Sequence, residues 1–311
     1  MQIYSLSGTE NVPKLTAELP GSSVMVLGFF DGVHLGHVAL IAAAREYAEK
    51  VGAPLCVWTF SSVPKAARVI TTRDEKLDIF SSLGVDCTVL EDFSAVRDLE
   101  HDVFFDEIIV KQFSPRALFC GFNFRYGRGA AGDAKTLVSS AEKAGIRAFV
   151  LPPYEVGGSP LSSSRIRELI SEGAVDEAAS LLGRPLSYTS PVLHGKRIGG
   201  RIGYPTINQR LGGGKITPLF GVYCASVSLD GRQYRGVCNI GCRPTVNDDE
   251  SDITLETHVF GYDGDAYGKE ATVSLLTLLR REKRFSSTDE LSSQIASDCA
   301  AALSYFENNH N

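Results

Sequence analysis

A ten-residue segment between two predicted secondary-structure elements constrains this chain more than any other. Residues 28–37 read Gly-Phe-Phe-Asp-Gly-Val-His-Leu-Gly-His, after the apolar run 23–27 and before the amphipathic stretch 38–50. His34 and His37 are three apart, so they can share one face at the start of a helix. At that position, backbone N–H groups and the positive end of the helix dipole favour phosphate. The pattern is typical of a strand, a glycine-rich turn and a helix that together hold a nucleotide.

The histidine pair also fits two simpler interpretations, namely solvated side chains at a helix start or half of a metal site. A metal site needs further Cys or His ligands at matching spacing. The other histidines, at positions 101, 194, 258 and 310, are scattered, and the sequence contains no Cys-x-x-Cys. The glycines and the acidic residue around the pair instead favour nucleotide chemistry. The residues of this segment expected to contact the nucleotide are Gly28, Phe30, Asp31, Gly32, His34 and His37.

The composition is that of an ordinary soluble protein, and its charge disfavours a nucleic-acid partner. Of the 311 residues, 43% are hydrophobic and 22% are charged, and the net charge is -6. A nucleic-acid binder usually carries a basic surplus. No stretch approaches the ~20 apolar residues of a membrane span, and no secretory signal is evident, so we expect a cytoplasmic protein without a membrane partner. The seven cysteines lie mostly in apolar runs, which predicts buried free thiols.

The pattern of apolar runs changes near residues 183–187, and this change predicts two domains. Before it, short apolar strands alternate with amphipathic helices, which implies an α/β fold with a parallel sheet covered on both faces. After it, β-rich runs follow one another across turn signals. We expect an α/β domain over 1–184 and, over 185–311, a small antiparallel β-barrel or closed sheet with a terminal helix. The expected strands are 24–28, 54–60, 85–90, 117–120, 146–151, 222–229, 233–240, 253–260 and 271–279, and the expected helices are 38–50, 73–83, 103–112, 133–144 and 288–306.

Two further segments of the first domain carry residues suited to a phosphorylated ligand. Residues 121–129, Gly-Phe-Asn-Phe-Arg-Tyr-Gly-Arg-Gly, follow a predicted strand, and their glycines let the backbone approach a ligand closely. Residues 162–167, Ser-Ser-Ser-Arg-Ile-Arg, open a helix, where hydroxyls, N–H groups and arginines suit a triphosphate. Taken alone, the first segment is equally a glycine-rich turn, and the second is equally a helix cap.

A basic, glycine-rich segment of the second domain has the features of a loop that wraps phosphates. Residues 194–208 read His-Gly-Lys-Arg-Ile-Gly-Gly-Arg-Ile-Gly-Tyr-Pro-Thr-Ile-Asn. Glycines permit close backbone approach and the cations supply charge, although an exposed flexible hairpin can have the same composition. Thr206 and Asn208 are two apart on an extended segment, so their neutral oxygens lie on one side. Mg²⁺ prefers such hard oxygen ligands, and a magnesium site follows as an expectation.

The order and spacing of these motifs resemble one family across most of the chain. Segment 28–37 resembles the Gly-x-Phe-Asp-Gly-x-His-x-Gly-His signature of HIGH-motif nucleotidylyltransferases. Segments 121–127 and 162–167 are similar to the Gly-x-Asn-Phe-Arg-Phe-Gly and Ser-Ser-Thr-x-Ile-Arg motifs of the same module. Residues 203–208 look like the Gly-Phe-Pro-Thr-x-Asn signature of riboflavin kinases. Together they resemble the bacterial bifunctional riboflavin kinases/FAD synthetases.

The resemblance implies two ATP-dependent activities in one chain. The first, Rossmann-like domain would adenylylate FMN to FAD and release pyrophosphate, and the second would phosphorylate riboflavin to FMN with Mg²⁺ and ATP. One departure concerns the segment after the second strand, where the family usually carries Phe-x-Pro-His-Pro and this chain reads Phe-Ser-Ser-Val-Pro over residues 60–64. Because of this departure, a protein that acts as a riboflavin kinase alone stays an alternative. A non-catalytic flavin- or nucleotide-binding regulator is a third possibility, and the oligomeric state stays open.

The resemblance also implies roles for individual residues. In the first domain, His34 and His37 would contact the ATP phosphates and the developing charge. The pyrophosphate side is expected to involve Ser163, Ser164 and Arg167, and the flavin side Asn123 and Arg125. In the second domain, the residues expected to bind ATP are Gly195, Lys196, Arg197, Gly203, Pro205, Thr206 and Asn208, with Thr206 and Asn208 as the magnesium ligands. Glu256 would accept the proton of the riboflavin 5′-hydroxyl, and Arg280 would support this site or be a surface charge.

Overall fold

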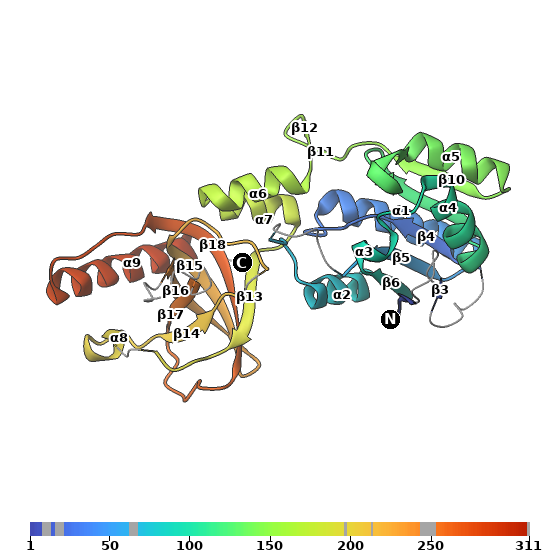
Figure 1. Ribbon diagram of the computed structural model, residues 1–311. Helices are drawn as coiled ribbons and strands as arrows, with labels where there is room; N and C mark the ends of the chain where they lie inside the picture. Colours follow the sequence, from blue (N-terminus) through green and yellow to red (C-terminus); the bar gives the residue numbers. More distant parts are fainter. Residues whose placement is uncertain are drawn as a thin grey trace. The chain divides into compact units, whose positions relative to one another are not determined.

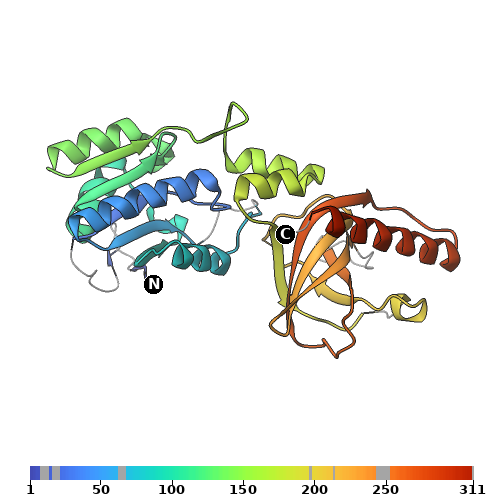
Figure 2. The ribbon, with the colours of Figure 1, turned by 180° about the vertical axis from the view of Figure 1, so that it is seen from behind.

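The computed structural model describes residues 1–7, 14–15, 22–61, 68–195, 198–212, 214–242 and 253–309. Contacts divide the chain into two compact units, Met1–Ser163 and Ser164–Asn311. Each unit has its own main sheet and its own apolar cluster, and each is described by itself. The elements of both can be followed in Figure 1 and, from behind, in Figure 2.

The first unit is built on a six-stranded parallel sheet, as the alternating sequence pattern predicts. Its strand order is β1-β6-β5-β4-β7-β10, and every neighbouring pair is parallel. The strands are β1 (Gln2–Tyr4), β4 (Val24–Leu27), β5 (Leu55–Phe60), β6 (Cys87–Glu91), β7 (Ala117–Gly121) and β10 (Arg147–Leu151). Because β4 and β5 lie in the middle of the sheet, their carboxyl ends meet at the edge where ligands bind in such folds.

Helices cover both faces of this sheet. Alternate residues of β4 point to opposite faces, so Val24 and Val26 join one apolar cluster and Met25 and Leu27 join another. Helices α1 (Leu35–Val51) and α2 (Arg73–Ser82) complete the first cluster, and α5 (Ala134–Lys143) and η1 (Phe104–Phe113) complete the second. The segment η1 is a π-helix where the sequence predicts an α-helix. Its buried residues recur at spacings of four and five, and a wider turn keeps them on one face.

Short elements fill the connections of the first unit. They are β2 (Leu6–Ser7), β3 (Lys14–Leu15), α3 (Phe93–Val96), α4 (His101–Val103), β8 (Arg125–Tyr126), η2 (Arg128–Ala130), β9 (Gly132–Asp133), β11 (Glu155–Val156) and β12 (Ser159–Pro160). The pairs β2–β3, β8–β9 and β11–β12 form small antiparallel ribbons. The β8–β9 ribbon belongs to the glycine-rich segment 121–129 and its continuation, so that segment is more than a plain turn.

The second unit contains a six-stranded antiparallel sheet that nearly closes into a barrel. Its order is β13-β18-β15-β16-β17-β14, and a bridge between Leu193 and Asn208 brings the two ends of this order together. The strands are β13 (Leu186–Pro191), β14 (Ile207–Arg210), β15 (Gly221–Leu229), β16 (Arg232–Cys242), β17 (Ile253–Val259) and β18 (Glu270–Arg281). The helices are α6 (Ser163–Glu172), α7 (Val175–Leu182), α8 (Ile198–Arg201) and α9 (Thr288–Asn308). Residues Ala302 and Phe306 of α9 pack on the barrel beside Val222 and Val237.

The sequence-based expectations agree with the fold in class and differ in detail. The strands β1, β13 and β14 are not among the expected strands, and each is short or lies at an end of its sheet. The contacts place α7 in the second unit, so the contact division falls before the predicted boundary between residues 184 and 185, which stays a prediction. All seven cysteines carry free thiols, and five of them are buried.

Gln209 joins the two ends of the barrel sheet. Its side chain is 1% exposed, and its Nε2 donates to the carbonyl oxygens of Ser190 at 2.9 Å and Ala271 at 2.7 Å. Ser190 of β13 and Ala271 of β18 are a directly paired couple, whereas Gln209 belongs to β14 at the other end of the order. One buried amide therefore links the strands that the backbone ladder leaves least connected.

We expect Gln209→Leu to lower the free energy of unfolding by about 1–3 kcal/mol, because two buried carbonyl groups lose a donor. Urea denaturation followed by circular dichroism measures the change. Thr189→Ala is the matched control, since Thr189 and Thr272 form an exposed hydroxyl pair on the same two strands. Its effect should stay within about 0.5 kcal/mol. Equal stability of Gln209→Leu and the unmodified protein would contradict this role.

Candidate active sites

The turn after β4 has a backbone that few residues adopt. Phe30 and Val33 have φ values of 53° and 37°, and Gly32 has a φ of 82°. A positive φ is strained for residues other than glycine, so the surrounding structure must hold it in place. The buried Asp31 does so through Oδ1, which accepts a hydrogen bond from the Ile70 N–H at 2.9 Å.

Two more hydrogen bonds fix the same turn. The Gly32 N–H donates to Thr71 Oγ1 at 3.1 Å, and Ser163 Oγ donates to the carbonyl oxygen of Asp31 at 2.8 Å. Asp31 and Ser163, both expected to contact ATP, thus have a structural task in shaping the turn. Their direct contact with a nucleotide stays a prediction.

The two histidines stack at the start of α1. His34 is the N-cap, and its Nδ1 accepts a hydrogen bond from the His37 N–H at 3.3 Å. The imidazole rings lie 3.6 Å apart with 13° between their planes, and the edge of His37 meets Phe30 at 5.1 Å. The stack and the cap fix both rings beside the first turn of a 17-residue helix. This end of α1 can stabilise negative charge through backbone N–H groups, the helix dipole and the imidazoles.

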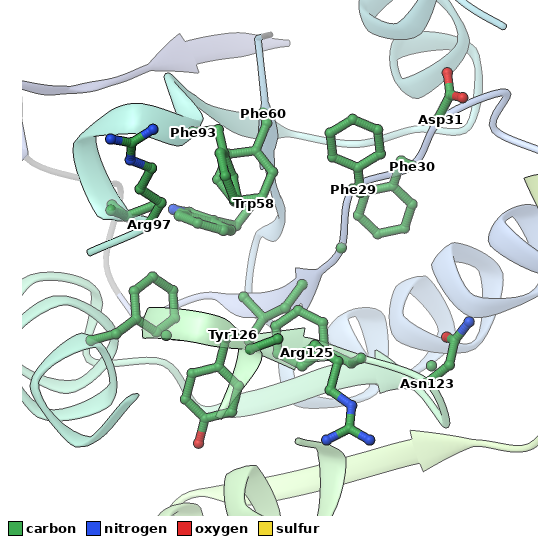
Figure 3. A pocket seen from close by; sticks show the side chains of 18 of the residues that line it. Phe29, Phe30, Asp31, Trp58, Phe60, Phe93, Arg97, Asn123, Arg125 and Tyr126 are labelled. Atoms are coloured by element: carbon green, nitrogen blue, oxygen red, sulfur yellow. The ribbon is translucent and has the colours of Figure 1, made fainter. Parts of the chain in front are cut away.

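A cavity of about 800 Å³ opens beside this turn (Figure 3). Its volume is within the range of small-molecule sites. The cavity brings together seven residues predicted from the sequence, namely Gly28, Phe30, Asp31, His37, Asn123, Arg125 and Ser163. Gly32 and His34 lie behind its lining, in the turn and at the helix cap. Gly28 is required there, because a Cβ at this position would come within 2.7 Å of the Phe30 ring.

Aromatic side chains that are not among the predicted contact residues form much of the cavity wall. Trp58 meets Phe60 edge to face at 4.8 Å between ring centroids, Phe60 meets Phe93 at 5.2 Å, and Phe29 lies 6.0 Å from Phe60. Phe104, Phe124 and Tyr126 extend the lining. Trp58 and Phe60 are two apart at the carboxyl end of β5, and that spacing is the sequence signal for a shared face. Such a wall suits a planar heteroaromatic ligand.

Ser164 and Arg167 lie on α6, and the contacts assign this part of α6 to the second unit. Their predicted role at the nucleotide phosphates stays a prediction. Residues 62–67, which include the Ser62 and Val63 departure, fall outside the described residues.

A row of polar residues crosses the barrel of the second unit. Asn208 of β14 pairs with Glu256 of β17, which pairs with Asn239 of β16. The row continues through Val222 of β15 to Arg280 of β18. Directly opposed residues of antiparallel strands share one face, so the register alone collects these side chains. Four of the five, Val222, Asn239, Glu256 and Arg280, line a cavity of about 250 Å³.

Thr206 lies between that cavity and a second one. It lines the 250 Å³ cavity and also a cavity of about 450 Å³ that Pro205, Ile207 and residues 262–267 help to form. Asn208 Nδ2 lies 3.4 Å from Thr206 Oγ1, so the two predicted metal ligands are neighbours. Gly203 has a φ of 87° in the turn before them. Lys196 and Arg197, predicted to bind ATP, fall outside the described residues.

Arg280 is held by a carboxylate of the terminal helix. Its Nε donates to Asp298 Oδ1 at 2.9 Å and its Nη2 donates to Asp298 Oδ2 at 2.9 Å, and Asp298 is buried. The guanidinium lies 5.6 Å from the centre of the Phe285 ring. The side chain of Arg280 is therefore held in one orientation, and its support of the site stays a prediction.

The two units therefore define a class of protein in which an α/β unit has a cavity beside a glycine-rich turn and a helix start, and a small barrel aligns Asn208, Glu256 and Asn239 by strand register. Comparisons with known proteins sharpen that class. The family model described as FAD synthetase matches residues 16–165, and the one described as riboflavin kinase matches residues 182–306. The chain belongs to the bifunctional riboflavin kinase/FMN adenylyltransferase family.

Relatives of that name cover nearly the whole chain. The bifunctional riboflavin kinase/FMN adenylyltransferase of Bacillus subtilis is 33% identical, over 94% of this chain and 96% of its own. Those of Pseudomonas fluorescens and Escherichia coli K12 are 35% and 34% identical, over 90% and 91% of this chain and 91% and 92% of their own.

A solved structure from Streptococcus pneumoniae, named as a macrolide-efflux protein, is 30% identical with a TM-score of 0.86, over 97% of this chain and 99% of its own. This likeness concerns the fold. Within the described residues, no helix is long and apolar enough to cross a membrane.

The packing of Gly195 against Asn208 gives a test of the second site. A Cβ on Gly195 would lie 2.6 Å from the Asn208 carboxamide, so Gly195→Ala must displace that side chain. We expect FMN formation to fall at least about tenfold, because a small misplacement of a positioning group has effects of this size or larger. Gly200→Ala is the control, since a Cβ there meets nothing within 4 Å. Initial rates of riboflavin phosphorylation measure both variants, and equal rates would contradict the placement of Asn208.

Proposed function

We propose that this protein makes FMN from riboflavin and ATP in its second unit and FAD from FMN and ATP in its first. The observation that supports this best is the presence of two separate sets of cavities, each next to a different phosphate motif. Its partners are then small molecules, and we place it in the cytoplasm, with the functional boundary between residues 184 and 185. Two alternatives remain testable, a kinase with an inactive first unit and a regulator without turnover.

In the first unit, the flavin ring of FMN would lie against the wall of Trp58, Phe60 and Phe93. Asn123 and Arg125 lie on the other side of the same cavity and would contact the flavin or its ribityl phosphate (Figure 3). A phosphate oxygen of FMN attacks the α-phosphorus of ATP, the new P–O bond forms, and the bond to pyrophosphate breaks. No covalent enzyme intermediate is required.

Catalysis of this step consists of alignment and charge stabilisation. His34 and His37 would contact the ATP phosphates at the start of α1, where Gly28, Phe30, Asp31 and Gly32 shape the turn. Ser163, Ser164 and Arg167 would act on the pyrophosphate that leaves. The stacked imidazoles need little reorganisation during the reaction, because their orientation is fixed before substrate arrives.

In the second unit, Glu256 would accept the proton of the riboflavin 5′-hydroxyl as its oxygen attacks the γ-phosphorus of ATP. The bond from that phosphorus to ADP breaks, and FMN and ADP are the products. Riboflavin would bind at the 250 Å³ cavity, which Glu256, Phe285 and several apolar side chains line. The 450 Å³ cavity on the other side of Thr206 would hold ATP, together with Gly195, Lys196, Arg197, Gly203 and Pro205. Arg280 would keep its place in the lining of the 250 Å³ cavity through Asp298.

Thr206 and Asn208 fit the requirements of Mg²⁺. They are neighbouring neutral oxygen donors, with Thr206 directly before the end strand β14 and Asn208 within it, next to a cavity where bound ATP would supply phosphate oxygens. When bound, the ion would neutralise charge on the ATP phosphates.

One assay tests the proposal as a whole. The purified protein is incubated with riboflavin, ATP and Mg²⁺, and the flavins are resolved by chromatography. We expect FMN to appear first and FAD to follow. Accumulation of FMN without FAD would favour the kinase alone, and the absence of both products would favour a regulator.

Glu256→Gln should abolish FMN formation, with a loss of about 100-fold or more, because the amide cannot accept the proton. Conversion of supplied FMN to FAD should be unchanged. Glu282→Gln is the control, since Glu282 lines the same cavity outside the Asn208–Glu256–Asn239 row. A folded Glu256→Gln protein that loses both activities would count against separate sites.

His37→Ala should have the reciprocal effect. We expect FAD formation from FMN to fall about 100-fold or more, as happens when one preorganised donor to a developing charge is removed. Riboflavin phosphorylation in the same sample is the internal control and should be retained. The rates of FAD formation and of riboflavin phosphorylation are measured with FMN or riboflavin as the sole flavin. An equal loss of both rates would refute the role of His37.

A further inference from the structure

Lys76 of α2 has no role in any of the sequence motifs, yet it is buried behind the first site. It is 5% exposed, and its Nζ donates to the carbonyl oxygen of Phe29 at 3.0 Å and to that of Phe60 at 3.2 Å. The two carbonyl groups come from different elements. Phe29 begins the turn after β4, and Phe60 ends β5. One ammonium group therefore joins the turn after β4 to the end of the neighbouring strand β5.

The residues that it joins both line the cavity. The rings of Phe29 and Phe60 lie 6.0 Å apart, and Phe60 is the centre of the aromatic wall, in contact with both Trp58 and Phe93. Figure 3 shows Trp58, Phe60 and Phe93 as one group, with Phe29 beside them. The backbone position of Phe60 affects where Trp58 and Phe93 lie, because both of these rings pack against the Phe60 ring.

Charge strengthens the two hydrogen bonds. Burial lowers the pKa of Lys76 to about 8, and the nearby Asp31 carboxylate opposes that shift. Lys76 thus carries its charge on most molecules at pH 7, and hydrogen bonds from a cation are stronger than neutral ones. Its ammonium also lies 5.1 Å from the centre of the Phe29 ring. Lysine is rarely buried to this extent without such partners.

We propose that Lys76 is a positioning residue for adenylyl transfer, which holds the flavin wall in place relative to the nucleotide turn. The inference rests on the proposed function of the first unit. Lys76 touches no substrate in this account, and it acts through the backbones of Phe29 and Phe60. Its loss should therefore weaken the use of FMN more than the use of ATP, because the turn keeps its other anchors at Asp31 and Gly32.

A neighbouring hydroxyl provides a matched control. Thr59 Oγ1 donates to the same Phe29 carbonyl at 2.9 Å. Thr59→Val removes a donor from Phe29 alone, whereas Lys76→Met removes a donor from both carbonyl groups at nearly constant side-chain length. Comparison of the two variants separates loss of the link between Phe29 and Phe60 from loss of a hydrogen bond to Phe29 alone.

The first measurement needs no turnover. Trp58 is the sole tryptophan of the chain and packs on Phe60, so intrinsic fluorescence reports on the wall. We expect Lys76→Met to shift the emission maximum of the ligand-free protein, and we expect Thr59→Val to leave it unchanged. A spectrum of Lys76→Met identical to that of the unmodified protein, in the presence of a lowered Tm, would reduce Lys76 to a purely structural residue and overturn the proposal.

The second measurement is steady-state kinetics of FAD formation. Lys76→Met should raise the KM for FMN about tenfold or more, with the KM for ATP changed less than about threefold. Riboflavin phosphorylation should be unaffected, and Lys76→Arg, which keeps the charge and the donors, should recover part of the loss. Equal increases of both KM values, or an Arg variant as weak as the Met variant, would overturn the proposal. If Lys76→Met does not fold, Lys76→Gln replaces it with the same outcomes.

The two proposals fail in different ways. An unmodified protein that forms no FAD would refute the function proposed for the first unit, while the fluorescence comparison would still decide the role of Lys76. An active protein whose Lys76→Met variant retains its spectrum and its KM for FMN would refute the role of Lys76 alone.

Discussion

The first site depends on one constraint, the left-handed backbone of the turn that joins β4 to α1. Phe30 and Val33 are strained in this conformation, and hydrogen bonds of Asp31 Oδ1 with the Ile70 N–H and of the Gly32 N–H with Thr71 help to hold the turn. The turn directs the chain from the middle of the sheet into the helix that begins with the two histidines. It also presents the Phe29 and Phe30 rings to the cavity. A relaxed turn would change the position of the start of α1 relative to the aromatic wall, and with it the arrangement proposed for ATP and FMN.

The second site depends on register instead of strain. Glu256 stands between Asn208 and Asn239 because three strands pair at one level. A shift of one residue in β17 would turn Glu256 to the other face of the sheet. Gln209 and the Leu193–Asn208 bridge hold β14 at the end of the strand order, and so they hold the predicted metal ligands opposite the predicted base. The same contacts therefore stabilise the barrel and position the residues of the predicted site.

The sequence predicts those parts of the sites that lie within a few residues of each other. His34 and His37 share one turn of helix, and Thr206 and Asn208 share one extended segment, so local periodicity places them correctly. The alternation of short apolar runs with amphipathic helices likewise predicts the parallel sheet, because its inner strands, such as β4 and β6, are buried on both faces.

Residues brought together by tertiary structure escape this kind of prediction. The aromatic wall combines the end of β5 with α3 and β8, and Lys76 comes from a helix whose sequence looks like any amphipathic surface helix. The edge strand β1 is too short to show a period, and the wide turns of η1 cannot be told from an α-helix by its apolar residues alone. The pairing of Arg280 with Asp298 depends on how α9 docks on the barrel, which no local pattern encodes.

The two sites solve the same electrostatic problem with different means. Both must bring ATP close to another oxygen nucleophile, and both must recognise the same tricyclic ring, once as riboflavin and once as FMN. The second unit offers a small cavity and a carboxylate, because its acceptor is a neutral hydroxyl that has to lose a proton. The acceptor of the first unit is already an anionic phosphate, so a base would serve no purpose there and a carboxylate near the reacting atoms would repel it. We propose that the two histidines at the helix start meet that requirement, and Asp31 is compatible with it because its Oδ1 accepts the Ile70 N–H.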